Sequence, residues 1–225
     1  MFDHLSGRYD LFCLLTSMGQ DARWRRIALE PLREGMRMLD LGCGTGDLSL
    51  SAASRFPNHP AQVVGIDFSQ KMLDRAQERL KARPALKTAD VKFLRRSAED
   101  LPMEREYYDL VVSGFVLRNI YENIDYILRG IYDSLKPDGS ISFLDITEPS
   151  NPVKRKLWRA YLFTVVAFYG KILFGGAYPV AYLPDSAQRF VKPPDFMKKL
   201  EAAGFKKIKT RFFMLGSIVL YQAQK

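Results

Sequence analysis

Residues 38–50, MLDLGCGTGDLSL, carry the strongest structural signal in the chain. An apolar run ends at Leu41, glycines follow at alternate positions from Gly42 to Gly46, and a helical pattern begins near Asp47. Glycines let a backbone turn sharply and approach a ligand closely, and the first turn of a helix offers unpaired N–H groups. This stretch therefore predicts a strand, a ligand-binding loop and a helix in succession.

Further apolar runs bounded by turn residues follow along the first two thirds of the chain. Together with the first run at 36–41, the apolar runs are residues 62–67, 91–95, 107–117 and 140–146. Helical patterns lie between them at Ser69–Lys81 and Asn123–Leu135. Pro137, Asp138 and Gly139 predict a turn just before the last of these strands. Strands that alternate with helices favour parallel βαβ units in an α/β domain.

The composition is that of a protein with a buried core, because 47% of the 225 residues are hydrophobic and 26% are charged. The first ten residues carry charges and no apolar segment, so they predict neither a secretory signal nor a transit peptide. Two cysteines and two histidines form no disulfide framework and no metal cluster. We therefore expect a cytoplasmic protein without a structural or catalytic metal.

The net charge of +9 is concentrated in the last third of the chain: residues 1–38, 39–150 and 151–225 carry +1, −3 and +11. Such an asymmetry suggests a polyanionic partner, either nucleic acid or an anionic lipid surface. A basic face that is merely solvated is the alternative.

Residues 153–176 are apolar and aromatic, with a stripe at helical spacing formed by Leu157, Tyr161, Val165, Phe168 and Ile172. A spanning helix needs about 20 apolar residues, and Arg159 and Lys171 leave a shorter uncharged stretch, so we expect no transmembrane helix. A core helix, a lid and a helix lying on a membrane surface remain open. Residues 195–205 then predict a helix, and residues 206–215 and 217–225 predict two closing strands.

Acidic residues around the glycine loop narrow the ligand class. A dinucleotide fingerprint would need glycine at Asp47, whose carboxylate disfavours a pyrophosphate. Asp40 precedes Gly42 by two residues and can face a cation, and Asp67, 21 residues after Gly46, stands where a carboxylate binds ribose hydroxyls. A ligand with ribose, positive charge and no phosphate is S-adenosylmethionine. The candidate residues are Asp40, Gly42, Gly44, Gly46 and Asp67; a purely structural turn and a dehydrogenase are the alternatives.

The segments LDLGCGTGD and GIDFSQKML resemble those of class I methyltransferases. Together with RYDLFCLLTSMGQDARWR, SAEDLP, SGFVLRNI, YLPDS, EAAGF and GSIVLY, they are similar to the quinone C-methyltransferases of ubiquinone and menaquinone biosynthesis. The resemblance implies a Rossmann-like α/β fold, with a mostly parallel seven-stranded sheet flanked by helices and a helical lid before the last two strands. It divides the single domain 1–225 into a helical cap (1–35), a cofactor-binding core (36–150), an aromatic substrate lid (151–192) and a closing helix and strands (193–225).

The resemblance implies methyl transfer from S-adenosylmethionine to a demethylated polyprenyl quinol, of the demethylmenaquinol or 2-methoxy-6-polyprenyl-benzoquinol type. The matching cofactor positions are Thr45, Asp67, Ser97, Ala98 and Gly114, and the matching active-site pair is Arg118 and Asn119. Three positions depart from the family pattern: Ser97 replaces Asp or Asn, Cys13 replaces Asn, and Tyr221 replaces His.

A quinol ring becomes reactive as a hydroxyl beside the reacting carbon loses its proton, and such a phenol has a pKa near ~10. We expect Arg118 to stabilise the oxygen charge and Asn119 to orient the ring or the cofactor; a structural ion pair of Arg118 with Asp67 or Asp145 is the alternative. A bound water, Asp145 and Asp185 are candidate bases. Tyr9 and Tyr182 are candidates for the ring pocket.

An isoprenoid tail would account for the aromatic lid, formed by Trp158, Tyr161, Phe163, Phe168, Tyr169 and Phe174. Anionic lipid would attract the basic residues Lys154, Arg155, Lys156, Lys206, Lys207 and Lys209. We therefore expect a peripheral protein on the inner face of the membrane, and the sequence leaves a homo-oligomer open.

Three rival functions stay open at this stage. A methyltransferase of another amphipathic acceptor, such as a phospholipid amine, needs only the glycine loop and Asp67. An RNA methyltransferase would suit the basic third, but the chain has no base-flipping motif of the Asn-Pro-Pro-Tyr or Pro-Cys type, so we expect no nucleic-acid partner. A non-catalytic cofactor-binding scaffold subunit would fit the departures at Cys13 and Ser97.

Overall fold

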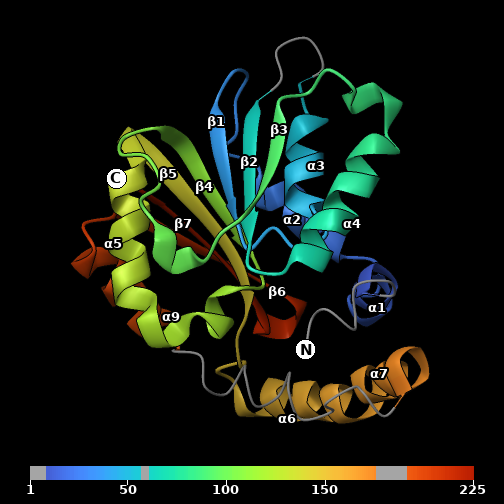
Figure 1. Cartoon of the computed structure of the whole chain (residues 1–225). Coiled ribbons are helices and arrows are strands. Elements are labelled where there is room, and N and C mark those ends of the chain that lie inside the picture. Colours follow the sequence, from blue (N-terminus) through green and yellow to red (C-terminus); the bar gives the residue numbers. More distant parts are fainter. Residues whose placement is uncertain (1–8, 57–60, 176–191) are drawn as a thin grey trace.

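The computed structural model of the chain describes residues 9–56, 61–175 and 192–225 (Figure 1). A seven-stranded sheet forms its centre, in the order β3-β2-β1-β4-β5-β7-β6. The strands are β1 (Arg37–Leu41), β2 (Gln62–Asp67), β3 (Val91–Arg95), β4 (Tyr108–Gly114), β5 (Leu135–Ile146), β6 (Lys206–Phe213) and β7 (Ile218–Gln224). β1 to β5 pair in parallel, and β7 is antiparallel to both of its neighbours. The predicted α/β fold with a mostly parallel sheet is confirmed.

Helices cover both faces of the sheet. α2 (Asp21–Ala28), α3 (Asp47–Ala53) and α4 (Gln70–Lys81) lie on one face, and α5 (Ile124–Ser134) and α9 (Pro193–Ala202) lie on the other. Each face buries its own apolar cluster. Trp24 and Leu48 meet Leu110 on the first face, and Ile127 and Phe196 meet Phe143 on the second. Because a parallel sheet is covered on both faces, its central strands are mostly apolar, as their sequences indicated.

The fourth strand is shorter than predicted. The apolar run 107–117 suggested a strand up to Leu117, but β4 ends at Gly114 and Phe115 has a φ of 64°. The chain then forms a 3-10 turn over Leu117–Asn119. Arg118 therefore lies on a turn that crosses the carboxyl end of the sheet, and not at the end of a strand.

The predicted turn before the fifth strand lies inside it. β5 begins at Leu135, and its register against β4 jumps from the pair Tyr108/Leu135 to the pair Leu110/Ser140. Asp138, with a φ of 62°, lies within this bulge. A bulge places extra residues on one strand without ending the ladder, which is why the turn residues did not mark the start of the strand.

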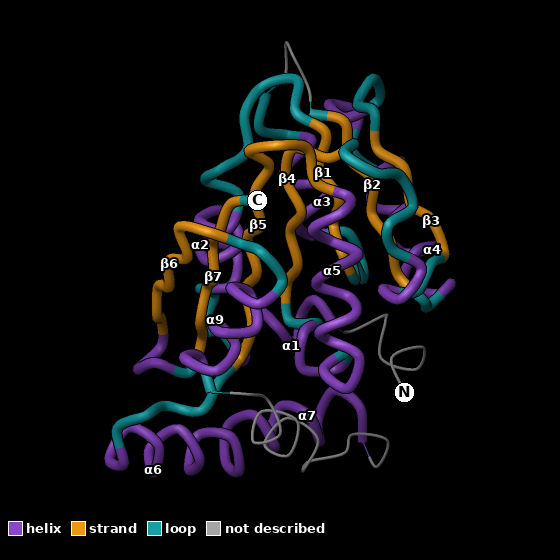
Figure 2. Tube along the Cα trace, turned by 90° about the vertical axis from the view of Figure 1, so that its left-hand side faces the viewer, coloured by secondary structure: helices purple, strands orange, loops and turns teal. Residues whose placement is uncertain are grey.

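The apolar segment 152–174 is one helical rod with a local change of pitch. It consists of α6 (Pro152–Tyr161), a π-helical stretch (Leu162–Val166) and α7 (Ala167–Phe174), and it crosses the carboxyl edge of the sheet beside α1 (Tyr9–Thr16) (Figure 1, Figure 2). Phe12 of α1 packs against Phe174, with 5.5 Å between the ring centroids.

The rod presents two apolar faces. Its buried stripe is formed by Trp158, Leu162, Val166 and Gly170, and its exposed stripe by Val153, Leu157, Phe168 and Ile172. Phe163 is exposed as well, to one side of this stripe. Three members of the stripe found by helical spacing, Leu157, Phe168 and Ile172, are thus exposed, so this stripe does not face the core. By length and composition the rod could cross a membrane, and 22% of its most apolar stretch is buried.

The predicted basic cluster is divided between two ends of the sheet. Lys206 pairs with Gln224, which pairs with Ser140, so it lies beside the amino-terminal part of β5. α6 follows the carboxyl end of β5, beyond Ile146. Lys154 and Lys156 are therefore remote from Lys206 and its neighbours Lys207 and Lys209, and they belong to separate surfaces.

Candidate active site

A cavity of about 720 Å³ opens where β1, β2 and β4 end. It lies at the carboxyl edge, where open α/β sheets bind ligands. Most of the candidate residues line it: Asp40, Gly42, Gly44, Thr45, Asp67, Ser97, Ala98, Gly114, Arg118 and Asn119. Residues far apart in the sequence thus meet in one site.

Gly46 is an exception among the cofactor candidates, because it does not line this cavity within the described part of the chain. Its φ is 85°, and an added Cβ would lie 3.1 Å from Ala76 and Phe93. Gly46 therefore serves the packing of the loop. Gly42 lines the cavity with a φ of 67°, and a Cβ there would lie 2.4 Å from Val116, so the turn excludes any side chain.

Asp40 presents a buried carboxylate to this cavity. Its Oδ2 accepts hydrogen bonds from the Ser49 amide at 3.0 Å and the Ser49 hydroxyl at 2.6 Å. Its Oδ1 is buried and has no hydrogen-bond partner among the described residues. Burial raises the pKa of Asp40 to about 7. A buried acceptor of this kind indicates a site for a ligand N–H donor, and a cation would complete its charge.

Asp67 and Thr45 help to shape the loop. Asp67 accepts hydrogen bonds from the Gly44 amide at 3.0 Å and the Ser69 amide at 2.9 Å, which fixes its carboxylate beside the glycines. The Thr45 hydroxyl and carbonyl both accept from Arg79, at 2.8 and 2.9 Å. Thr45 therefore lines the cavity with a hydroxyl whose position Arg79 fixes.

Ser97, one of the departures from the family pattern, has an acidic neighbour. Its hydroxyl donates to Glu99, whose other carboxylate oxygen accepts from Asn123 at 3.2 Å. These hydrogen bonds lower the pKa of Glu99. Glu99 lines the same cavity, so this end of the site carries a carboxylate two residues after Ser97.

Arg118 forms an almost completely buried ion pair with Asp145. Its Nη1 lies 2.7 Å from Asp145 Oδ1, and the two side chains are 4% and 0% exposed. Nη1 also donates to the Phe115 carbonyl at 2.7 Å, and the Arg118 amide donates to Asp145 Oδ2 at 3.1 Å. The ion pair considered from the sequence thus exists with Asp145, and it holds the guanidinium at the cavity wall.

A second cavity, of about 100 Å³ and largely apolar, adjoins the first. It lies among α1, α2, the rod 152–174 and the start of β7, and Phe12, Trp24, Trp158, Leu162 and Ile218 are among its walls. Arg25, Phe115 and Arg118 line both cavities. A polar ligand in the first cavity and an apolar ligand in the second would therefore meet at this shared wall.

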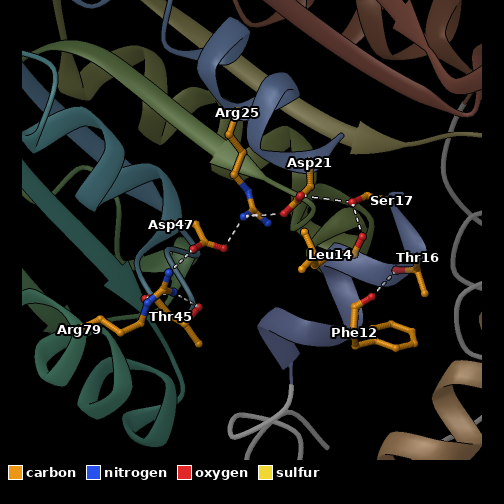
Figure 3. A network of polar contacts seen from close by, with 9 residues as sticks. All are labelled: Phe12, Leu14, Thr16, Ser17, Asp21, Arg25, Thr45, Asp47 and Arg79. Carbon is orange, nitrogen blue, oxygen red and sulfur yellow. Dashed lines mark hydrogen bonds and ion pairs between the residues drawn. The ribbon is translucent and has the colours of Figure 1, made fainter. Parts of the chain in front are cut away.

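A chain of ion pairs joins the amino-terminal helices to the glycine loop (Figure 3). Arg25 of α2 lies 3.3 Å from Asp21 and pairs with Asp47 at the start of α3, and Arg79 of α4 lies 2.7 Å from Asp47 on its other side. Burial alone would raise the pKa of Asp47, but the two arginines hold it below its ordinary value.

The family model described as the ubiE/COQ5 methyltransferase family matches residues 1–225. The chain belongs to this family. It is 35% identical over 223 residues to the ubiquinone/menaquinone biosynthesis C-methyltransferase UbiE of Syntrophotalea carbinolica, covering 98% of this chain and 91% of that protein. It is also 35% identical to the demethylmenaquinone methyltransferase of Thermus thermophilus, covering 91% of each chain.

Solved structures share the fold of this ubiE/COQ5 family member. An S-adenosylmethionine-dependent methyltransferase from Mesorhizobium loti has a TM-score of 0.63 at 21% identity, covering 91% of this chain and 98% of its own. One from Aquifex aeolicus has a TM-score of 0.61 at 18% identity, covering 91% and 89%. The predicted family and the predicted S-adenosylmethionine-dependent methyltransferase activity are therefore confirmed.

The cavity suits S-adenosylmethionine. The buried Oδ1 of Asp40 would accept a hydrogen bond from the ammonium group, and the carboxylate of Asp67 beside the loop would accept from the ribose hydroxyls. Gly42 has no side chain and would leave room for the cofactor to approach the backbone closely. The structure also adds residues that the sequence did not single out, above all Arg25. In the sequence, the only feature that pointed to Arg25 was its place in the segment DARWR, which belongs to a stretch that resembles the family.

Two ring-pocket candidates lie beyond what the structure describes. Tyr9 begins α1, but its side chain is outside the described part, and Tyr182 falls in 176–191, outside the described residues. The candidate base Asp185 lies in the same segment. These assignments stay predictions.

Proposed function

We propose that this methyltransferase transfers a methyl group to a ring carbon of a prenylated quinol, and that the small apolar cavity holds the ring. The contact between this cavity and the cofactor cavity, across Arg25, Phe115 and Arg118, is the observation that carries the proposal. An aromatic ring among Trp24, Trp158 and their neighbours would be adjacent to the methyl donor. The names of the curated relatives point to the same class of acceptor.

The reaction forms a bond between the methyl carbon and the ring carbon, breaks the bond from methyl to sulfur, and releases the proton of that ring carbon to water. When bound, the cofactor supplies an electrophilic methyl group on a sulfonium sulfur. The protein must make the ring electron-rich, and stabilising a developing phenolate does so. Arg118 suits this task, because Asp145 and the Phe115 carbonyl fix its guanidinium at the shared wall before the ring arrives.

Asp145 fits a positioning role better than that of a base. It is 0% exposed, and its oxygens accept hydrogen bonds from the Arg118 side chain, the Arg118 amide and the Ile146 amide. A carboxylate so enclosed does not reach a substrate hydroxyl directly. We assign Asp145 to the orientation of Arg118, and Asn119, which lines the cofactor cavity, to the orientation of the ring or the cofactor.

A methyl-transfer assay with labelled S-adenosylmethionine tests the acceptor. It compares chemically reduced demethylmenaquinol and 2-methoxy-6-polyprenyl-benzoquinol with their oxidised forms, in detergent. We expect product only from a reduced ring, because the oxidised quinone has no hydroxyl to ionise. Labelling of the oxidised forms, or labelling of a phospholipid amine in preference to both quinols, contradicts the proposal.

A matched pair of substitutions tests the pocket. Leu162→Trp fills the apolar cavity, whereas Leu157→Trp makes the same change on the exposed stripe of the same rod, where Leu157 is 57% exposed. We expect Leu162→Trp to raise KM for the quinol at least tenfold with cofactor affinity unchanged, and Leu157→Trp to leave both near the wild-type values. Equal effects of the two changes would show that the cavity does not receive the ring.

The exposed stripe of the rod supports a peripheral position on the inner face of the membrane, where a prenylated acceptor resides. Phe168 is 60% exposed on this stripe and Phe163 is 55% exposed to one side of it, and the rod also carries the exposed residues Lys154, Lys156 and Lys171. An apolar stripe with lysines binds an anionic bilayer interface. We expect sedimentation with vesicles rich in phosphatidylglycerol, which Phe163→Ser/Phe168→Ser weakens and the control Lys206→Gln/Lys207→Gln does not. Equal sedimentation of all three proteins would refute this position.

A further inference from the structure

The methionine end of the cofactor carries a carboxylate as well as an ammonium group, and a buried carboxylate needs a cation. Three arginines among the described residues line the cofactor cavity, namely Arg25, Arg96 and Arg118. They come from α2, from the end of β3 and from the turn after β4, so they occupy different parts of the wall. Their positions decide which of them can meet this carboxylate.

Two of the three arginines are poorly placed. Arg96 is exposed and directly precedes Ser97, at the end of the cavity that also holds Glu99. Arg118 is held by Asp145 and the Phe115 carbonyl on the side of the acceptor cavity.

Arg25 is linked to Asp40 through the first turn of α3, because it pairs with Asp47, two residues before Ser49, and Ser49 donates two hydrogen bonds to Asp40. Burial raises the pKa of the Asp40 carboxyl, and the positive charge of Arg25 on α2 opposes this rise. Asp47 lies three residues beyond Gly44. The ammonium and the carboxylate of the cofactor are attached to the same carbon atom, so a cofactor whose ammonium meets Asp40 brings its carboxylate to the neighbouring part of the wall.

The network around Arg25 keeps its guanidinium in this position. Asp21 lies 3.3 Å away on its own helix, and Asp47 holds it from the glycine loop, with Arg79 behind (Figure 3). Its side chain is 12% exposed, so the charge acts at close range with little screening by water. A guanidinium has five N–H donors in a planar fork, which lets it serve several carboxylates at once.

We propose that Arg25 binds the α-carboxylate of S-adenosylmethionine, and that Asp21 and Asp47 position it for this contact. Arg25 also lines the apolar cavity. α2 thereby contributes one side chain to two sites, because Arg25 completes the cofactor site and also forms part of the wall of the acceptor site. This inference rests on the cofactor alone and does not depend on the identity of the acceptor.

Calorimetric titration with three ligands tests the contact: S-adenosylmethionine, its decarboxylated form, and methylthioadenosine, which lacks the amino-acid group. The proteins are wild type, Arg25→Gln, Arg25→Lys and the control Arg26→Gln, which removes an exposed charge from the same helix. We expect the wild type to prefer S-adenosylmethionine to its decarboxylated form by about 10- to 100-fold, the range for hydrogen bonds to charged groups. Arg25→Gln should abolish this preference and leave methylthioadenosine affinity within threefold, Arg25→Lys should retain part of it, and Arg26→Gln should retain all of it.

Three outcomes would overturn the proposal. Equal losses for all three ligands in Arg25→Gln would assign Arg25 to the structure of the loop. If Arg25→Gln keeps the preference for S-adenosylmethionine over its decarboxylated form but has a lower kcat with the quinol, Arg25 acts on the quinol and not on the cofactor carboxylate. If Arg25→Gln does not fold, by circular dichroism and thermal melting, the wild-type preference still decides, because its absence alone contradicts a cation at the carboxylate.

Discussion

Asp40→Asn offers the most direct test of the cofactor cavity, because the Asp40 carboxylate is 1% exposed and its Oδ1 has no partner within the described residues. Burial raises its pKa from 3.8 to about 7, Asp67 on β2 adds to the rise, and the Ser49 hydrogen bonds and Arg25 on α2 oppose it. The carboxyl is therefore about half protonated near neutral pH in the cofactor-free protein, and a bound ammonium group would convert it to the carboxylate.

The size of the effect follows from this pKa of about 7. The ionised fraction is about 1% at pH 5 and about one half at pH 7, so cofactor affinity should rise about 50-fold between them. Binding at pH 5.5 should release about one proton. The contribution of Asp40 to stability has the opposite trend: between about pH 4 and 7 this carboxyl binds more protons in the cofactor-free folded state than in the unfolded chain, so its contribution to the free energy of unfolding falls as pH rises.

Calorimetry in two buffers with different ionisation enthalpies measures both the affinity and the released proton. Asp40→Asn is the control, since it keeps His4, His59 and every other titrating group. It should bind the cofactor at least tenfold more weakly at pH 7 and show no dependence between pH 5 and 7. An affinity that is constant over this range in the wild type, or a slope that persists in Asp40→Asn, would refute the assignment of the ammonium to Asp40.

Three further substitutions test neighbouring parts of the site. Gly42→Ala should abolish cofactor binding by calorimetry, because its Cβ would lie 2.4 Å from Val116 at a φ of 67°; retained binding would mean that the loop can move. Asp145→Asn should lower stability in urea by ~3–5 kcal/mol by leaving the buried charge of Arg118 unpaired, and lower kcat with cofactor affinity unchanged; wild-type kcat would remove Arg118 from catalysis. Tyr221→Phe should leave the melting temperature unchanged or higher, because the buried hydroxyl has no hydrogen-bond partner among the described residues, whereas a clear loss of stability would reveal a partner.

The fold could be predicted from the sequence because its signals are local. Each parallel strand is an apolar run that ends in turn residues, and the glycine loop at Gly42 carries its own backbone requirement. Asp40 and Asp67 were found for the same reason, since both stand at the carboxyl ends of predicted strands and such ends meet at one edge of a sheet.

The errors share a different cause, since they depend on what packs against each segment. The run 107–117 is mostly apolar up to its end at Leu117, but the backbone turn at Phe115 ends β4 at Gly114. The spacing in the rod left a core helix, a lid and a membrane-surface helix open, and the packing shows that the core lies under Trp158 and Leu162 on another face. A rod that is apolar on two sides has no single periodic signal, so tertiary contacts alone decide which side is buried.

Arg25 and Arg118 show why the chemistry of this site is a property of the fold. Both residues were visible in the sequence as parts of family-like segments, but 93 positions separate them. The fold places both at the wall shared by the two cavities and gives each a fixed acidic partner, Asp47 for one and Asp145 for the other. Because a paired guanidinium stays in place without its ligand, the two proposed contacts, to the cofactor carboxylate and to the quinol oxygen, would use donors that are already oriented, and the rate gain from such donors depends on that preorganisation.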